Sequence, residues 1–181
     1  MRLPPERKKL TRLLVARVVG GAPHEGRLMA GTLTLRCALG RAGLTQHKRE
    51  GDGATPTGRM ELLYAYVRPG RFSRAQVAAR LFTLREGLVW CDDPESFFYN
   101  RFAARRGVWR CEELYRADRL YDFVGVLGYN VAPRVRGRGS AIFLHVATDD
   151  LAPTAGCVAL RARDLARLAP RLARGVVLLL R

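Results

Sequence analysis

The chain has little of several residue types that mark particular classes of protein. It contains three histidines and four cysteines among 181 residues, and no two cysteines have the CxxC spacing of a zinc or redox site. We therefore expect neither a metal site nor a cofactor. No apolar run approaches the roughly 18 residues that a membrane-spanning helix needs. The sequence thus predicts no transmembrane segment.

Acidic residues are also scarce, and this gives the chain a strong charge of one sign. There are 16 Asp and Glu against 32 Lys and Arg, for a net charge of +16, and all but three of the basic residues are arginines. Such a surface attracts polyanions, among them nucleic acid, anionic lipid and wall polymers that carry carboxylates and phosphates. The arginines are scattered and no nucleic-acid-binding module is recognisable, so nucleic acid is not an expected partner. An arginine-rich composition with solvated side chains explains the charge equally well.

The length and the hydrophobic content of 48% are typical of one globular domain over 1–181. We expect 1–11 to be a flexible or trimmed N-terminal segment. The basic start is followed by an apolar stretch that Arg17 interrupts, and no small-residue cleavage pattern follows, so it does not read as a signal peptide. Either the protein stays inside the cell or the chain begins after a removed leader.

Aliphatic and β-branched runs bounded by Gly and Pro indicate a strand-rich chain. A helix is expected over 73–81 with Ser73 as its cap, and a second over 161–173, where Pro170 would kink or end it. Residues 41–59 read as a long loop, and 82–119 lack periodicity. The expected strands are 11–19, 26–40, 60–67, 120–130, 140–147 and 175–180. The pattern predicts a mainly β fold, a sandwich or barrel with a few helices and one late helix.

One stretch, HVATDDLAPTAGCVAL, brings a histidine close to a cysteine. His145 ends an apolar predicted strand, and Cys157 follows Gly156. An imidazole that takes the thiol proton turns a cysteine into a nucleophile, and the amides of Gly156 and Cys157 could stabilise an oxyanion. We expect Gly156-Cys157 to open a helix whose N-terminus favours the thiolate. The alternative is a structural thiol and a histidine that happen to be near each other.

The other histidines and cysteines offer weaker candidates for this chemistry. His24 follows Pro23 in a turn, and His47 lies in a basic loop that nothing in the sequence places against Cys157. Cys37 lies in an apolar run and is expected to be a buried small hydrophobe. The two remaining cysteines, Cys91 and Cys111, could pair if the protein lives outside the cytoplasm.

Two segments rich in aromatic, charged and amide side chains are candidates for the substrate-binding wall of a Cys157 cleft. Loops of this composition are often binding loops, although the aromatics could equally cover an edge of the core. Arg138 could pair with a carboxylate in bidentate geometry. The candidate residues are Trp90, Asp93, Tyr99 and Asn100 in the first segment, and Tyr129, Asn130 and Arg138 in the second.

The stretch SAIFLHVATDDLAPTAGCVAL, with GDGATPTGRMEL upstream, resembles the L,D-transpeptidase (YkuD-type) catalytic domain family. His145 matches the histidine of that family's first motif. Thr154, Gly156, Cys157 and Val158 match its Ser/Thr-His-Gly-Cys motif, and the TPTG at 55–58 is similar to its Thr-Pro-x-Gly stretch. The resemblance covers roughly residues 12–181. Two positions depart from the pattern: the motif's own histidine is replaced by Ala155, and the arginine usual two residues after the cysteine is Ala159. The gap of 12 residues between His145 and Cys157 is also shorter than the usual one.

The resemblance implies a β-rich fold, an acyl-enzyme on the cysteine, and peptidoglycan stem peptides as donor and acceptor. The product would be a 3-3 or 1-3 cross-link, carbapenem β-lactams would be inhibitors, and the workplace would be the periplasm or cell wall. Two alternatives stay open. One is hydrolysis of the same bonds by an L,D-carboxypeptidase or endopeptidase, and the other is a non-catalytic basic module that binds the wall.

Overall fold

Strands dominate the part of the chain that the computed structural model describes, which is residues 13–18, 21–72, 77–104, 109–173 and 175–181. The prediction of a mainly β fold with one late helix is confirmed within these ranges. The N-terminal segment 1–11 lies outside them. The strands are β1 (Leu13–Val18), β2 (Glu25–Ala30), β3 (Leu33–Ala38), β4 (Leu44–Thr45), β5 (Thr55–Pro56), β6 (Gly58–Val67), β7 (Leu81–Thr83), β8 (Leu88–Cys91), β9 (Arg101–Ala104), β10 (Cys111–Glu113), β11 (Phe123–Leu127), β12 (Phe143–Val146), β13 (Val158–Leu160) and β14 (Val177–Leu180), and the helix is α1 (Ala162–Leu168).

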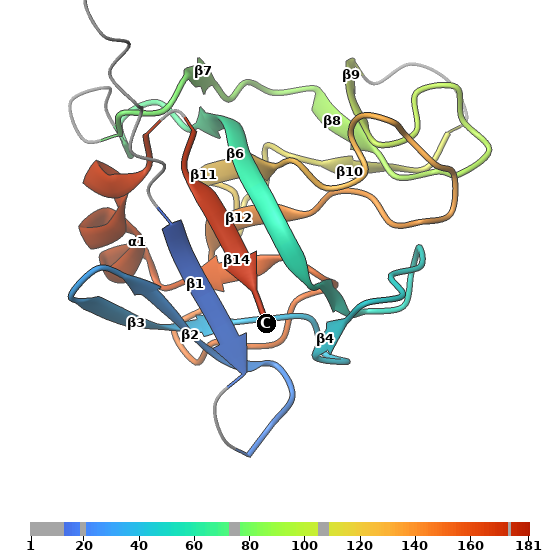
Figure 1. The fold of residues 1–181 in the computed structure, drawn as a ribbon. Helices are drawn as coiled ribbons and strands as arrows, with labels where there is room; N and C mark the ends of the chain where they lie inside the picture. Colours follow the sequence, from blue (N-terminus) through green and yellow to red (C-terminus); the bar gives the residue numbers. More distant parts are fainter. Residues whose placement is uncertain (1–12, 19–20, 73–76, 105–108, 174) are drawn as a thin grey trace, which may run out of the picture.

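The main sheet closes on itself. Its strand order is β11-β12-β13-β3-β2-β1-β14-β6-β7, and β6 also pairs with β11, which closes the strands from β11 to β6 into a barrel and leaves β7 beside β6. The long strand β6 makes this possible because its first half pairs with β14 and its second half with β7, while β11 pairs along it from Leu62 to Val67. Figure 1 shows β6, β14 and β1 side by side across the barrel. Closure leaves the ring of strands without free edges.

The barrel interior is filled by aliphatic side chains from alternate positions of the strands. β2 shows the pattern clearly, since Gly26, Leu28 and Ala30 are buried and the residues between them are more exposed. In β6 the buried positions change phase, from Met60 and Leu62 to Ala65 and Val67, beside a register irregularity in its pairing with β11. A bulge of this kind re-aims the side chains of a strand and bends it, as barrel closure requires.

The predicted strand over 26–40 is in fact a hairpin. β2 and β3 pair in antiparallel register from Glu25↔Ala38 to Ala30↔Leu33, so only Gly31 and Thr32 form the turn. Gly31 has φ +64, a backbone conformation that a two-residue hairpin turn uses and that glycine adopts without strain. The uninterrupted run of strand-forming residues on both sides hid this turn in the sequence.

The predicted helix over 73–81 is wrong in its described part. Ser73 and the three residues after it lie outside the described residues, whereas residues 77–80 are not helical and Leu81 begins β7. Leu81 pairs in parallel with Ala65 of β6, and Val77 and Leu81 are buried in the barrel core. Pairing with an available edge of β6 outweighs the helical propensity of this segment.

The late helix is shorter than the predicted 161–173. α1 is followed by a 3-10 turn over Ala169–Arg171, which agrees with the expectation that Pro170 kinks or ends the helix. Leu165 and Leu168 point into the barrel core. The final strand, expected over 175–180, is confirmed as β14, which pairs in parallel with β1.

A second layer lies outside the barrel and is built from the segment that lacked periodicity. β8, β9 and β10 form a three-stranded sheet in the order β10-β8-β9, on the side of the barrel away from β1, β2 and β3 (Figure 1). Trp90 and Leu114 of this layer join a second apolar cluster with Val124, Val126 and Phe143 from the barrel strands. This packing places the β8–β10 sheet over the outer face of β11 and β12.

Candidate active site

His145 and Cys157 lie on neighbouring strands. β12 and β13 run parallel, with Leu144 opposite Val158 and His145 opposite Ala159, so Cys157 lies next to Phe143 just before β13. Paired residues of neighbouring strands share a face, and the face alternates along each strand. His145 and Cys157 therefore share the outer face of the barrel, two positions apart along the strand direction.

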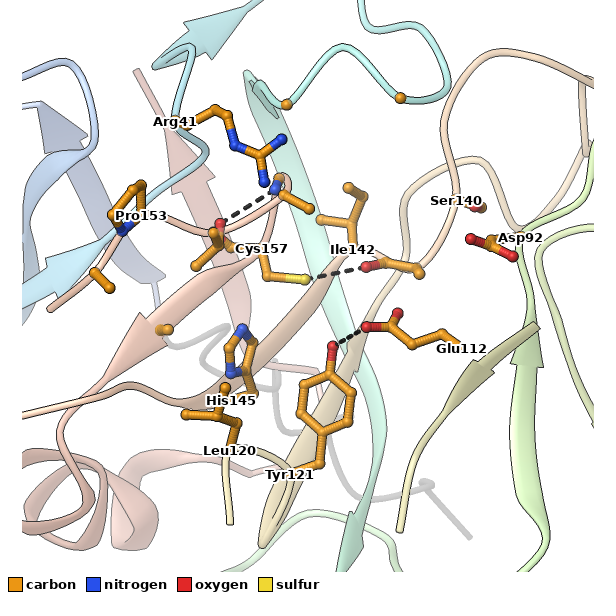
Figure 2. Close-up of a pocket in the computed structure, with 18 of the residues that line it drawn as sticks. Arg41, Asp92, Glu112, Leu120, Tyr121, Ser140, Ile142, His145, Pro153 and Cys157 are labelled. Atoms are coloured by element: carbon orange, nitrogen blue, oxygen red, sulfur yellow. Dashed lines mark hydrogen bonds between the residues drawn. The ribbon is translucent and has the colours of Figure 1, made fainter. Parts of the chain in front are cut away.

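Both side chains line one cleft of about 550 Å³ between the barrel and the second layer. Figure 2 shows the imidazole, the thiol, Tyr121 and Glu112 arranged around the same space. Of the three histidines, all within the described residues, only His145 lines this cleft; His47 is exposed beside a different hollow and His24 borders a small third one. The preference for His145 over its rivals thus has a geometric basis.

The turn that carries Cys157 is held by two threonines. The Thr154 hydroxyl donates to the Cys157 carbonyl oxygen at 2.8 Å and accepts from the Gly156 amide at 3.1 Å. The buried Thr55 hydroxyl accepts from the Gly40 amide at 2.7 Å and donates to the same Cys157 carbonyl at 3.4 Å. Thr55, the first threonine of TPTG, therefore connects Gly40, which follows β3, to the turn that carries Cys157.

Gly156 is required by its backbone and by its surroundings. Its φ is +145, and a Cβ at this position would lie 2.9 Å from the Ala54 carbonyl oxygen. Any larger residue would push the Cys157 turn away from the TPTG segment. The same turn uses the Gly156 amide internally, for the bond to the Thr154 hydroxyl, so this amide does not point at the cleft as a free donor.

The expectation that Gly156 and Cys157 open a helix is wrong. Cys157 precedes β13, and α1 begins only at Ala162. The strand lies between them because Val158 and Leu160 fill the barrel core while pairing with β12. No helix N-terminus is therefore available to lower the pKa of the thiol.

The hydrogen bonds of His145 define which of its nitrogens can act as a base. Nδ1 lies 2.7 Å from the Val146 carbonyl oxygen, and because a carbonyl only accepts, Nδ1 carries the hydrogen. The lone pair is then on Nε2. Burial lowers the pKa of His145 to about 4, against the raising effect of backbone oxygens of Val146 and Leu120. The imidazole is therefore neutral at pH 7. The Tyr121 ring packs edge-on against it at 5.1 Å between centroids, which fixes the orientation of the imidazole.

The Cys157 thiol is buried, with 7% of the residue exposed. It donates to the Ala141 carbonyl oxygen at 3.1 Å and accepts from the Phe143 amide at 3.4 Å. Burial, followed by the nearby Glu112 carboxylate, raises the pKa of Cys157 to about 12, while the Phe143 amide and Lys48 act in the opposite direction. The thiol is therefore protonated at neutral pH, and its proton has to leave during the attack on a substrate.

Several charged residues that the sequence did not single out line the cleft. Lys48 is buried, and its ammonium donates to Asp52 Oδ1 at 2.5 Å and to the Arg49 carbonyl oxygen at 2.9 Å. On the other side of the cleft, the Tyr121 hydroxyl donates to Glu112 Oε1 at 2.5 Å. Burial raises the pKa of Glu112, and that of Tyr121 well above its ordinary value. The remaining charged lining residues are Arg41, Glu50, Asp92, Arg110 and Arg116.

A sequence signal existed for Lys48 alone. It precedes Asp52 by four residues in the segment that leads into TPTG, and the buried Lys48 packs against the Gly139 backbone. Glu112 and Tyr121 carry no comparable signal, because their positions depend on how the second layer docks on the barrel.

The first group of predicted substrate-binding residues lies behind the cleft. Trp90, Tyr99 and Asn100 are each 2% exposed. The Trp90 indole donates to Asn100 Oδ1 at 3.0 Å, the Asn100 amide donates to the Tyr129 and Asn130 carbonyls, and the Ala141 amide donates back to Asn100 Oδ1 at 3.1 Å. Trp90 and Asn100 thus hold the backbone around Ala141, whose carbonyl oxygen accepts from the Cys157 thiol.

The side chains of Tyr99 and Asp93 also form hydrogen bonds with other parts of the protein. The Tyr99 hydroxyl donates to Glu50 Oε2 at 2.6 Å, and the Asp93 carboxylate accepts from the amides of Glu95 and Arg110. Glu50 in turn lines the cleft. Tyr99 thus does not line the cleft itself but bonds to Glu50, which does.

The second group borders a separate hollow of about 710 Å³, which Tyr129, Asn130 and Arg138 line together with His47 and Lys48. Lys48 lines both this hollow and the cleft. Asn130 shapes its rim by donating to the carbonyls of Val135 and Gly139. The structure therefore brings Tyr129, Asn130 and Arg138 together around one hollow. Lys48 separates this hollow from the cleft that Cys157 lines.

Other kinds of site find no support in the described residues. Within them, no group of three or more His, Cys, Asp or Glu side chains is placed to hold a metal ion. None of the helices described there is long and apolar enough to cross a membrane.

A thiol, a neutral imidazole with a fixed tautomer, and a charged cleft between a β-barrel and its outer layer are the parts that cysteine acyl transfer requires. The family model for the L,D-transpeptidase catalytic domain (YkuD) matches residues 24–178. The chain belongs to this family, whose members are cysteine-dependent transpeptidases that act on the peptidoglycan of the cell wall. No curated protein and no solved structure matched the chain.

Proposed function

We propose that this protein is a peptidoglycan L,D-transpeptidase that uses Cys157 as nucleophile and His145 as general base. The observation that carries the proposal is the placement of thiol and imidazole on one face of two paired parallel strands, inside one cleft. The family membership supports the same chemistry.

In the first half of the reaction, Cys157 Sγ attacks the carbonyl carbon of the bond between the third residue of a tetrapeptide stem and its terminal D-Ala. His145 Nε2 takes the thiol proton as the S–C bond forms, and gives it to the departing D-Ala amine as the C–N bond breaks. The Cys157 amide stabilises the oxyanion. The Gly156 amide can donate to the oxyanion as well only if its hydrogen bond to the Thr154 hydroxyl breaks.

In the second half, the amine of an acceptor stem attacks the thioester. His145 Nε2 now accepts the amine proton and returns it to the departing thiolate, which regenerates the enzyme. A cross-link between two stems results, of the 3-3 type when the side-chain amine of residue 3 of the acceptor attacks. The 1-3 type would require that Cys157 be acylated by residue 1 of the donor in place of residue 3. If water takes the place of the amine, the same intermediate gives hydrolysis.

The charges of the cleft suit a substrate of mixed charge. A stem peptide carries carboxylates and a free amine. Figure 2 shows Arg41 and Glu112 on opposite sides of Cys157, and Lys48 lines the cleft beside Gly156. Because the positions of the family's motif histidine and arginine are Ala155 and Ala159 here, Arg41 and Lys48 are the candidate cations for substrate carboxylates. Such contacts are strongest where water is excluded.

We assign the acceptor stem to the second hollow, with Arg138 bound to one of its carboxylates and Tyr129 and Asn130 shaping the rim. Arg138→Ala should raise the KM for the acceptor by roughly tenfold, the cost of one charge-assisted contact, and leave kcat nearly unchanged. Steady-state kinetics at varied acceptor concentration measure this. An unchanged KM would exclude Arg138 from acceptor binding.

The proposed cellular location is the periplasm or the cell wall, because the stem peptides lie there. A fusion of the full-length gene to a reporter that is active only after export tests the location. A signal confined to the cytoplasm would contradict the cross-linking role.

The deciding experiment is incubation of the purified protein with tetrapeptide muropeptides, followed by mass analysis. Cross-linked dimers that lack one D-Ala, absent with Cys157→Ala, support transpeptidation. Trimmed monomers alone would instead indicate the hydrolase. No turnover, with retained binding to wall polymer by both proteins, would favour the non-catalytic wall-binding module. A carbapenem adduct on Cys157 would identify the thiol independently.

A further inference from the structure

Two cysteines that the proposed chemistry does not use face each other in the second layer. β10 and β8 pair in antiparallel register, with Cys111 opposite Cys91, Glu112 opposite Trp90 and Glu113 opposite Val89. Both cysteines are free thiols in the structure. Directly opposite residues of paired strands put their side chains on the same face of the sheet.

The hydrogen-bond pattern of this strand pair shows which kind of contact the two cysteines make. The Leu114 amide donates to the Leu88 carbonyl at 3.0 Å, so Leu114 and Leu88 form a hydrogen-bonded pair. Such pairs alternate with non-bonded ones along an antiparallel ladder, which makes Cys111 and Cys91 a non-bonded pair. The Cα atoms of a non-bonded pair are about 4.5 Å apart, within the roughly 4.4 to 6.8 Å that disulfides span. The backbone therefore suits a disulfide without strand movement.

The two thiols also interact with each other. The pKa of Cys111 is raised to about 11. Burial is the largest cause, the neighbouring Cys91 thiol is the next, and Asp92 and Asp93 add to the shift. Cys91 is fully buried, whereas Cys111 is half-buried. An oxidant can thus reach Cys111 first, with Cys91 behind it as the resolving thiol.

The position of the pair relates it to the cleft. Asp92 follows Cys91, Glu112 follows Cys111, and both of these acidic residues line the cleft. Glu112 also accepts the Tyr121 hydroxyl that stands beside His145. A covalent bond at this point would hold together the two short strands that carry one wall of the cleft.

We propose that Cys91 and Cys111 are a disulfide site that clamps the β8–β10 wall of the cleft. The oxidant is a small or protein disulfide. The Cys111 thiolate attacks it, which releases one thiol and forms a mixed disulfide, and the Cys91 thiolate then attacks the Cys111 sulfur and releases the second thiol. The cysteine pair loses two electrons and two protons, and the oxidant gains them. Compartments outside the cytoplasm keep such bonds oxidised.

Peptide mapping of the full chain tests the site. The protein is equilibrated with a glutathione redox buffer on the oxidising side, unfolded in an alkylating reagent, and digested with trypsin without reductant. Cleavage at arginines isolates Cys91 in peptide 86–101 and Cys111 in peptide 111–116. We expect the two peptides joined and lighter than their sum by two hydrogen atoms, with Cys37 outside any such linkage. Alkylated peptides, a persistent glutathione adduct on Cys111, or a link between other cysteines would overturn the proposal.

Thermal unfolding tests the clamp. Reduction of the oxidised wild type should lower Tm by about 5 to 15 °C, as expected for loss of one disulfide in a chain of this size. Cys111→Ser is the control because that side chain is half-buried and tolerates a polar substitute, and its Tm should not respond to reductant. Equal Tm values for oxidised and reduced wild type would refute the clamp. If the variant does not fold, the wild-type map still decides the site, and neither readout depends on transpeptidase activity.

Discussion

The two faces of the β12–β13 strand pair have opposite properties although they share one backbone. The inner face carries Leu144, Val146, Val158 and Leu160, which are buried in the barrel core. The outer face carries Phe143, His145, Cys157 and Ala159, and three of these four line the cleft. The alternation of side chains along paired strands thus places a packed core on one face, and an imidazole and a thiol beside a cleft on the other.

Two cysteines extend the comparison from strands to single thiols. Cys37 lies in the barrel core and Cys157 faces the cleft, yet burial raises the pKa of each to about 12. The pKa therefore does not distinguish the proposed nucleophile from the core thiol. Geometry does, because Cys157 shares a strand face and a cleft of about 550 Å³ with His145, whereas Cys37 borders a hollow of only about 30 Å³.

The largest effect should come from the thiols themselves. Cys157→Ala should abolish turnover of tetrapeptide muropeptides, because the acyl-enzyme cannot form. Cys37→Ala, the matched substitution in the core, should keep kcat and lower the free energy of unfolding by about 1 kcal/mol. Product masses and urea unfolding measure the two quantities. Wild-type turnover by Cys157→Ala would make the thiol structural and remove the enzyme assignment.

His145→Ala should reduce kcat by roughly 10² to 10⁴-fold, the range for a lost general base. The control is His24→Ala, since His24 borders a different hollow, and its kcat should match the wild type. Single-turnover acylation measures the step directly. If both variants acylate at the wild-type rate, another group acts as the base.

A substitution on the inner face of the same strand should affect stability alone. Leu144→Ala opens a cavity in the core beneath His145 and should cost about 2 to 5 kcal/mol of the free energy of unfolding. The kcat of the protein that remains folded should stay near the wild-type value. A loss of kcat as large as that of His145→Ala would show that the two faces are not independent.

The smallest effect is a pH dependence of stability that belongs to the outer face. The pKa of His145 is about 4 in the folded protein and about 6.5 when unfolded. As pH falls from 6.5 towards 4, the unfolded chain takes up a proton that the folded protein excludes, so the folded state loses on the order of 2 to 3 kcal/mol.

His145→Gln isolates this contribution, since other acid-sensitive groups such as Asp52 and Asp118 remain in both proteins. Urea unfolding at pH 7 and pH 4.5 should show a larger loss for the wild type than for the variant. Equal losses would mean that His145 is not buried in its neutral form.

The fold class and the family could be predicted from the sequence because both depend on local patterns. Strand-forming runs with one late helix indicated a mainly β fold, and His145 together with Thr154, Gly156, Cys157 and Val158 resembled the family's motifs although the gap between His145 and Cys157 is shorter than usual. The β2–β3 hairpin and β7 were missed, since a two-residue turn interrupts no pattern and β7 owes its conformation to the edge of β6.

The chain by itself determined which residues alternate into a core and which short segments carry thiol, imidazole and threonine. Only the tertiary structure decided that Lys48, Glu112 and Tyr121 surround the thiol, that Trp90 and Asn100 stand behind the cleft, and that Cys91 faces Cys111. The physical reason is the distance along the chain between the residues that interact. Side-chain alternation follows from the backbone of each strand alone, whereas strand register, barrel closure and docking of the second layer depend on contacts between residues far apart in the chain.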